Sequence, residues 1–480
     1  MRQPSKRTGW LAGMALATAL LAGCTLGPNY QRPDLNLPTA WRFGDATTNS
    51  LADVACGALY RDPVLHELIA TALSNNPDLR VAQARMEQAA AALRIQRADH
   101  WPGIQGSAAY TRARQGHLPP LPGAEGDQFD VFGVLSYELD VWGRIRRLNE
   151  AARAQYLATE EARRTVQIGL VAGVASTYFN LRSLDHQLDI ARETLASRQG
   201  SLDLTRIKFA DGAGIVSELD VVQAQTQVTS AESAIASLQR RIAMTEHALS
   251  LLLGGYPGDI PRGLSLAEQW QPEDLPAGLP ADVLLRRPDV RAAEQSLIAA
   301  NANIGAARAA CFPAISLTGA HGLQSAELDD LLTTSISKAW NFQPQITAPI
   351  FNAGKLRANV RRAQAQQREA LATYEKTVQT AFRDVADALA GIRFLREQLA
   401  ADETTLRAEN RRLELAEDRY EGGVASYSDV LDAQRYQFSA QLNAVQTRNE
   451  LLNATVQLYK ALGGGLAPAE TEIPTSGETP

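Results

Sequence analysis

The chain has 480 residues, with 47 Lys and Arg against 53 Asp and Glu, so its formal net charge is -6. This length predicts two or three structural units, and the charge balance gives no sign of a nucleic-acid-binding surface. Only one short apolar run is present, which excludes a polytopic helical membrane protein. Three cysteines cannot form a disulfide framework or a four-ligand zinc site, and we expect Cys311 to be a small buried residue.

The N-terminal residues 1–23 have the pattern of an export signal. Three basic residues precede an apolar run at 10–21, and the run ends in Leu-Ala-Gly-Cys. This tetrapeptide resembles a bacterial lipobox, in which Cys24 is lipidated and its acyl chains anchor the mature chain to a leaflet. Thr25 follows in place of aspartate, which favours the outer membrane. A plain signal peptide with an incidental Cys24 is the alternative.

The rest of the chain consists of two copies of one sequence repeat. Asn76-Pro77-Asp78 recurs 211 residues later as Arg287-Pro288-Asp289, and Trp101-Pro102 recurs as Phe312-Pro313. Near the end of each copy the offset falls to 209, which pairs Asp220 with Asp429. The predicted organisation is a signal peptide at 1–23, a lipidated tether at 24–62, a first repeat at 63–255, a linker at 256–279, a second repeat at 280–464 and a tail at 465–480.

Each repeat contains a very long helical pattern. From Arg144 to Phe209 there is no proline, and large apolar residues recur at every seventh position from 174 to 209 and again from 385 to 420. Such a repeat predicts a coiled-coil-like seam. At 1.5 Å per residue the first helix would be about 100 Å long, so the helices must form a rod or a tube. A second helix follows, with predicted N-caps at Ser217 and Ser426 and predicted C-caps at Gly254 and Gly463.

Four stretches alternate with period two and predict β-strands. They lie at about 103–112, 129–141, 314–321 and 340–350. Each is about as long as a tilted strand that crosses a bilayer, with one apolar and one polar face. Lipid cannot satisfy the edges of a four-stranded sheet, so closure needs several chains, and three chains would give twelve strands and twelve helical rods. A soluble helical rod with hairpins packed on its own core is the alternative.

In this order the motifs resemble the outer membrane factor family of TolC-type exit ducts, in particular the NodT group of efflux lipoproteins. The resemblance implies a mainly α fold with a membrane β-barrel: a homotrimer with a 12-helix periplasmic α-barrel and a 12-stranded outer-membrane β-barrel, four strands per chain. The implied partners are a periplasmic adaptor, an inner-membrane pump and outer-membrane lipid. The segments that carry the resemblance are 24–33, 59–63, 285–290, 312–315 and 419–423.

The function implied by the resemblance is passive conduction of small toxic compounds across the outer membrane. An outer-membrane duct for type I protein secretion is the alternative. The sequence contains no GxSxG, HExxH or P-loop motif. We therefore predict a protein that is not an enzyme, with no catalytic residues, no metal and no cofactor besides the covalent lipid on Cys24.

The resemblance also implies a channel gate at the turn of the second helix pair, formed by Asp429, Asp432 and Tyr420. The two aspartates are three residues apart and share a helix face. Acidic residues in the first turn of a helix are also favoured by the helix dipole alone, and Asp220 occupies the same place in the first repeat. The expected adaptor-contact tips are Gly212, Gly214, Ser217, Gly422, Gly423 and Ser426.

Overall fold

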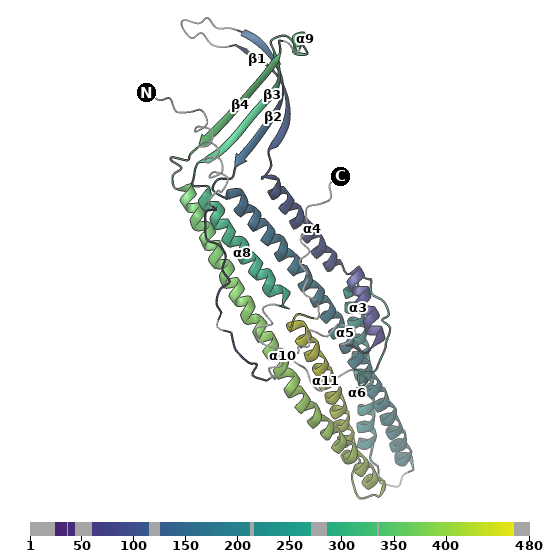
Figure 1. The fold of residues 1–480 in the computed structure, drawn as a ribbon. Helices are drawn as coiled ribbons and strands as arrows, with labels where there is room; N and C mark the ends of the chain where they lie inside the picture. Colours follow the sequence, from purple (N-terminus) through teal and green to yellow (C-terminus); the bar gives the residue numbers. More distant parts are fainter. Residues whose placement is uncertain are drawn as a thin grey trace. The chain divides into compact units, whose positions relative to one another are not determined.

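The computed structural model describes residues 25–35, 37–43, 60–114, 125–211, 216–269, 286–333 and 336–464. As predicted, the described chain is mainly helical, with two very long helices and four antiparallel strands (Figure 1). No helix of these residues is long and apolar enough to cross a membrane. The elements are α3 (Pro63–Asn75), α4 (Pro77–Ala98), β1 (Gly103–Arg114), β2 (Glu125–Leu139), α5 (Arg144–Ala210), α6 (Glu218–Leu252), α8 (Pro288–Ala309), β3 (Ala314–Ser325), α9 (Leu328–Leu331), β4 (Lys338–Thr347), α10 (Lys355–Glu421) and α11 (Tyr427–Ala461).

The chain divides into two compact units. The first combines Arg85–Glu160 and Ala292–Glu375 with the N-terminal residues up to Asp34, and the second contains the remainder. Each unit takes residues from both repeats. The helices α5 and α10 contribute to both units, because a helix of 67 residues is about 100 Å long and exceeds any single core.

The sheet in the first unit shows the duplication directly. Its strand order is β1-β2-β3-β4, and every neighbouring pair is antiparallel. Gly103 pairs with Ser136, and the residues 211 positions later, Ala314 and Thr347, pair in the same way. The central β2–β3 pairing joins the two repeats, whereas β1 and β4 are the edge strands of the described sheet.

The residues that follow Cys24 are held against the first unit. The Leu26 N–H donates to the Trp142 carbonyl at 3.2 Å. Gly27 touches Gly305 of α8 so closely that a Cβ on Gly27 would lie 2.5 Å from the Gly305 Cα. Farther along, Arg32 makes a two-pronged ion pair with Glu294 of α8, with N–O distances of 2.7 and 2.6 Å. The tether is thus fixed to the repeat helices at several points.

The seven-residue apolar pattern forms the buried seam of the second unit. In α5, Val174, Leu181 and Leu188 are buried, and in α10 the corresponding buried residues include Val385 and Ile392. The pattern therefore predicted which helix face packs inward. Cys311, by contrast, is exposed and not buried as expected, because it lies in the turn that follows the end of α8.

In both repeats a side chain near the start of the repeat hydrogen-bonds to a backbone carbonyl at the end of the last helix, but the side chain differs between the repeats. The Asn76 side-chain amide donates to the Leu252 carbonyl at 2.8 Å, and the Arg287 guanidinium donates to the Ala461 carbonyl at 3.2 Å. Each contact ties the start of the repeat to the end of its last helix. The predicted C-cap glycines come one residue after the caps, Leu253 and Leu462, and both have a positive φ.

A buried carboxylate organises the second unit. Asp62 is 0 % exposed and caps α3 by accepting the Val64 N–H at 3.0 Å. It also accepts hydrogen bonds from the Tyr178 hydroxyl at 2.8 Å, the Leu264 N–H at 2.9 Å and the Gln269 amide at 2.9 Å. Burial raises the pKa of Tyr178, so this phenol stays a donor. Four donors from three parts of the chain satisfy one buried charge.

We predict that Asp62→Ala destabilises the protein by about 3 kcal/mol, because it leaves buried donors without an acceptor. Thermal unfolding of the purified full chain, followed by circular dichroism, measures the change. Asp203→Ala, which removes an exposed carboxylate of α5, is the matched control and should leave the midpoint unchanged. Equal midpoints for the Asp62 variant and the control would contradict the role of Asp62.

Candidate functional site

The predicted gate residues and those predicted adaptor residues that the structure describes lie at two helix turns of the second unit. The first turn joins α5 to α6 and the second joins α10 to α11 (Figure 1). A shared apolar cluster packs the two helix pairs together next to these turns. Its buried members are Leu202, Ala224, Val228, Tyr427, Val430 and Leu431.

Gly422 and Gly423 end α10 in a well-defined turn. The Gly423 N–H donates to the Tyr420 carbonyl at 3.0 Å, and the Val424 N–H donates to the Arg419 carbonyl at 2.9 Å. This pair of bonds is a Schellman motif, and Gly423 has the positive φ of +73° that the motif requires. The glycine at position 423 is therefore explained by the geometry of the turn.

Ser217 and Ser426 are the N-caps of α6 and α11, as predicted. The backbone N–H and hydroxyl of Ser426 donate to the Asp429 carboxylate at 3.1 and 3.2 Å. Ser217 makes the same two bonds to Asp220, at 2.8 and 2.7 Å. Asp429 thus has a capping role that its counterpart in the first repeat shares, whatever else it does.

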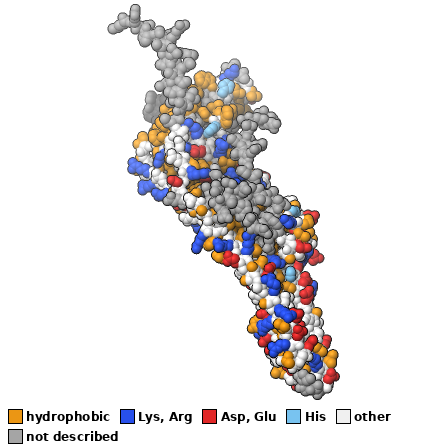
Figure 2. All heavy atoms as spheres, turned by 60° about the horizontal axis from the view of Figure 1, so that its bottom comes forward, with side chains coloured by type: hydrophobic (Ala, Val, Ile, Leu, Met, Phe, Trp, Pro, Cys, Tyr) orange, Lys and Arg blue, Asp and Glu red, His pale blue; other side chains and the backbone are white. Residues whose placement is uncertain are grey.

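Asp432 differs from Asp429 in its partner. Its carboxylate forms an ion pair with Arg435 at 3.1 Å, one helical turn farther along α11. Both aspartates are exposed, so neither is held in the apolar cluster. Acidic and basic side chains are interspersed over the lower part of the face drawn in Figure 2. The sequence analysis missed Arg435, although its spacing of three residues from Asp432 indicates such a pair.

Tyr420 is packed between the two helix pairs. Its ring centroid lies 5.3 Å from that of Tyr427, and the Lys208 ammonium of α5 lies 4.7 Å from the Tyr420 ring centroid. Burial raises the pKa of Tyr420, so the phenol is neutral near pH 7. The sequence analysis did not identify Lys208, because no local pattern relates residues so far apart in the chain.

The structure brings most of the predicted tip residues to this region. Ser217 belongs to the first turn, and Gly422, Gly423 and Ser426 belong to the second. Gly212, Gly214 and the predicted lipidation site Cys24 lie outside the described residues.

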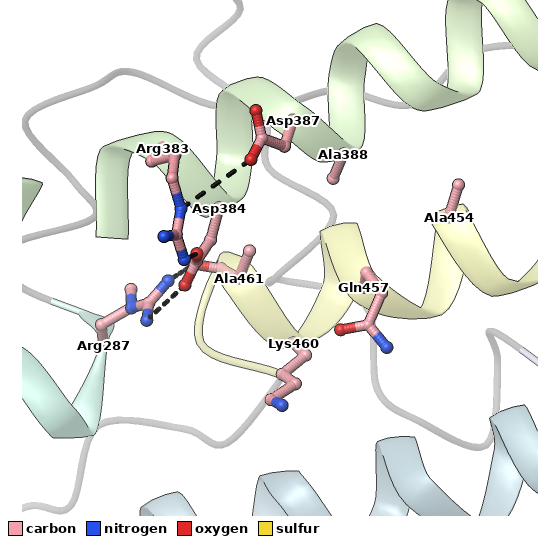
Figure 3. Close-up of a pocket in the computed structure, with 9 residues that line it drawn as sticks. All are labelled: Arg287, Arg383, Asp384, Asp387, Ala388, Ala454, Gln457, Lys460 and Ala461. Atoms are coloured by element: carbon pink, nitrogen blue, oxygen red, sulfur yellow. Dashed lines mark hydrogen bonds and ion pairs between the residues drawn. The ribbon is translucent and has the colours of Figure 1, made fainter. Parts of the chain in front are cut away.

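A cavity of about 510 Å³ between α10 and α11 offers no alternative reactive site. Arg287 is paired with Asp384 at 3.2 Å, and Arg383 is paired with Asp384 at 2.7 Å and with Asp387 at 3.8 Å. Lys460 extends away from this cluster (Figure 3). The arginines and aspartates of the cavity wall are therefore engaged in ion pairs with one another.

Comparison with known proteins accounts for this architecture. The family model described as "Outer membrane efflux protein" matches residues 68–255 and 279–464. The solvent efflux pump outer membrane protein SrpC of Pseudomonas putida is 46 % identical over 94 % of this chain and 97 % of its own. The cation efflux system protein CusC of Escherichia coli is 40 % identical over 93 % and 96 %.

A solved structure shows the same fold. The crystal structure of a membrane protein from Pseudomonas aeruginosa superposes with a TM-score of 0.85 at 38 % identity, and the match covers 92 % of this chain and all of that one. The resemblance and the fold class predicted from the sequence are therefore confirmed. The chain belongs to the outer membrane efflux protein family, and is a transport channel of the bacterial outer membrane that extends into the periplasm and not an enzyme.

Proposed function

We propose that the chain is the exit duct of a tripartite efflux system for small toxic organic compounds. The observation that carries this proposal is the 46 % identity, over nearly the whole chain, to a protein described as part of a solvent efflux pump. In this proposal an inner-membrane pump supplies the energy and a periplasmic adaptor docks at the two helix turns. The duct itself conducts passively. The experiment must distinguish this function from the alternative, type I protein secretion.

We infer that Cys24 is the lipid anchor. Thr25, the next residue, lies against Gly143, which follows β2 in the first unit: a Cβ on Gly143 would be 2.9 Å from the Thr25 Cγ2. The N-terminal segment thus starts at the ends of the strands, where acyl chains on Cys24 would enter the same bilayer. The intact mass of the mature protein gives the direct test of acylation.

A homotrimer closes the sheet in this proposal. The edge strands β1 and β4 leave backbone groups that lipid cannot satisfy. Three copies would supply twelve strands, and the internal repeat specifies how neighbouring copies pair. Leu135 of β2 lies opposite Gly319 of β3, where the first repeat meets the second. The equivalent positions on the open edges are Ile346 and Ala108, so these two should meet between copies.

We propose that Asp429, Asp432 and Tyr420 form the channel gate. Asp429 and Asp432 lie in the first turns of α11 and are exposed. Around a three-fold axis they would form two acidic rings, which would favour cations. Tyr420, held by Tyr427 and Lys208, is positioned to fix the helix pair in the closed state. The competing explanation for Asp429 is capping alone, as for Asp220.

The cargo is tested by deleting the gene. We expect the deletion strain to become sensitive to a set of solvents, antibiotics or dyes, and expression of the wild-type protein to restore growth. The measurement is growth inhibition across a panel that also includes aromatic acids and metal salts. An unchanged profile in a strain whose parent expresses the protein would contradict small-compound efflux, and sensitivity to metal salts alone would reassign the cargo to cations.

The trimer and its register are tested by cross-linking. In a Cys56→Ser, Cys311→Ser background, Ala108→Cys with Ile346→Cys should give covalent dimers and trimers on oxidation in outer membranes. The matched control replaces Gln345 instead of Ile346, because successive strand residues point to opposite faces. Denaturing electrophoresis measures the products. Cross-links that are absent from the test pair, or as strong in the control pair, would refute this register.

The gate is tested with a control from the other repeat. Asp429→Ala with Asp432→Ala should raise the conductance of channels in planar bilayers and the leakage of antibiotics into cells. Asp220→Ala with Gln223→Ala changes the equivalent positions of the first repeat, removes the same capping interaction and should leave conductance unchanged. The gate hypothesis fails if the two double variants behave alike.

A further inference from the structure

A second cavity, of about 490 Å³, lies in the first unit between the end of α4 and the start of α5. Leu93 forms its buried floor at 7 % exposure. Asn149 holds the two helices together, since its amide donates to the Gln96 carbonyl at 3.0 Å. The remaining wall is basic and aromatic. It consists of Arg97, His100, Trp101, Arg146, Glu150 and Arg153.

The charges of this cavity are not balanced within the described chain. Arg146 forms an ion pair with Asp140 at 3.2 Å, and Glu150 forms an ion pair with Arg147 at 2.7 Å. Arg97 and Arg153 are exposed and have no ion-pair partner among the described residues. Two guanidinium groups thus face one cavity without a counter-charge. Guanidinium groups bind phosphate well, because their N–H donors match its oxygens in pairs.

The cavity lies next to the start of β1, where the chain would enter the outer membrane. Trp101 and His100 connect α4 to β1, which starts at Gly103. The Trp101 side chain is 77 % exposed, and exposed tryptophans of membrane proteins concentrate at the lipid headgroups. Basic cavities at this depth bind anionic headgroups.

The second repeat keeps a counterpart of Arg97, which is Arg308, but it lacks the other features. The counterparts of Asn149 and Arg153, 211 residues later, are Val360 and Gln364. The Trp142 ring packs at a tilt against Phe312, the counterpart of Trp101, with 4.9 Å between ring centroids, but the counterpart of Trp142 is Ala353. A neighbouring copy paired by the repeat would therefore bring no ring to Trp101. Arg153 therefore has no basic counterpart in the second repeat, and Trp101 is 77 % exposed where its counterpart Phe312 is 42 % exposed.

We propose that this cavity binds the phosphate of an anionic phospholipid in the periplasmic leaflet of the outer membrane. Arg97 and Arg153 hold the phosphate, and Trp101 lies beside the upper part of the acyl chains. Bound lipid would fill the groove between α4 and α5 directly below the sheet.

The experiment uses the delipidated full-length protein in a zwitterionic detergent and phosphatidylglycerol with brominated acyl chains, which quench tryptophan fluorescence. We expect saturable quenching that the Trp101→Phe variant loses in part. The double variant Arg97→Gln, Arg153→Gln should bind the lipid about 30-fold more weakly. Each basic residue contributes about 1 kcal/mol, and about 1.4 kcal/mol corresponds to a tenfold change in affinity. Arg308→Gln is the matched control, because Arg308 is the exposed counterpart of Arg97 in the second repeat, and it should bind like the wild type.

Three results would overturn the proposal. Brominated phosphatidylcholine that quenches as strongly as phosphatidylglycerol in every variant would indicate ordinary annular lipid. Inorganic phosphate that competes for the site with an affinity equal to that of the lipid would indicate a site for a free anion. The double variant could also form less oligomer, while the oligomer that still forms binds lipid as the wild type does. That result would indicate that the arginines contact a neighbouring copy instead of lipid.

Discussion

The backbone groups along β1 and β4 are the constraint from which the assembly follows. Inside a bilayer every N–H and C=O must be paired, and a four-stranded sheet leaves two rows of them open. The chain cannot satisfy these rows by itself. In the proposed assembly the edges of the first and second repeats complement each other, so that each copy would offer its neighbour the same partner that its own central strands already have.

The long helices meet a different requirement. A coiled-coil seam of seven-residue period buries Val174, Leu181 and Leu188 without a globular core, so the helices can be as long as the periplasmic duct requires. The ends of such helices need separate anchors. Asn76 and Arg287 tie the start of each repeat to its last helix, and Asp62 joins the tether, α5 and the linker through one buried carboxylate. These polar contacts between distant segments fix the ends of the helices.

The fold could be predicted from the sequence because its determinants are periodic and local. Alternation of period two marked the strands, the seven-residue period marked α5 and α10, and Ser217 and Ser426 marked helix starts. The Asp62 network could not be predicted, since its partners Leu264 and Gln269 lie more than 200 residues away in the sequence. At the tips, Asp429 and Tyr420 were identified by resemblance, whereas Lys208 was missed because the Tyr420–Lys208 contact depends on tertiary packing.

The register of the two hairpins has a consequence for the origin of the chain. Gly103 with Ser136 and Ala314 with Thr347 are one pairing encoded twice, so the two hairpins share one strand register, as expected from a tandem gene duplication. A half-length ancestor with one hairpin would build the same ring from six identical subunits. After fusion the two halves could diverge: the first carries Trp101 and Arg153, whose counterparts are Phe312 and Gln364, and the second carries Asp432, whose counterpart is Gln223. A duplicated chain thus presents two kinds of surface, where six identical subunits would present one.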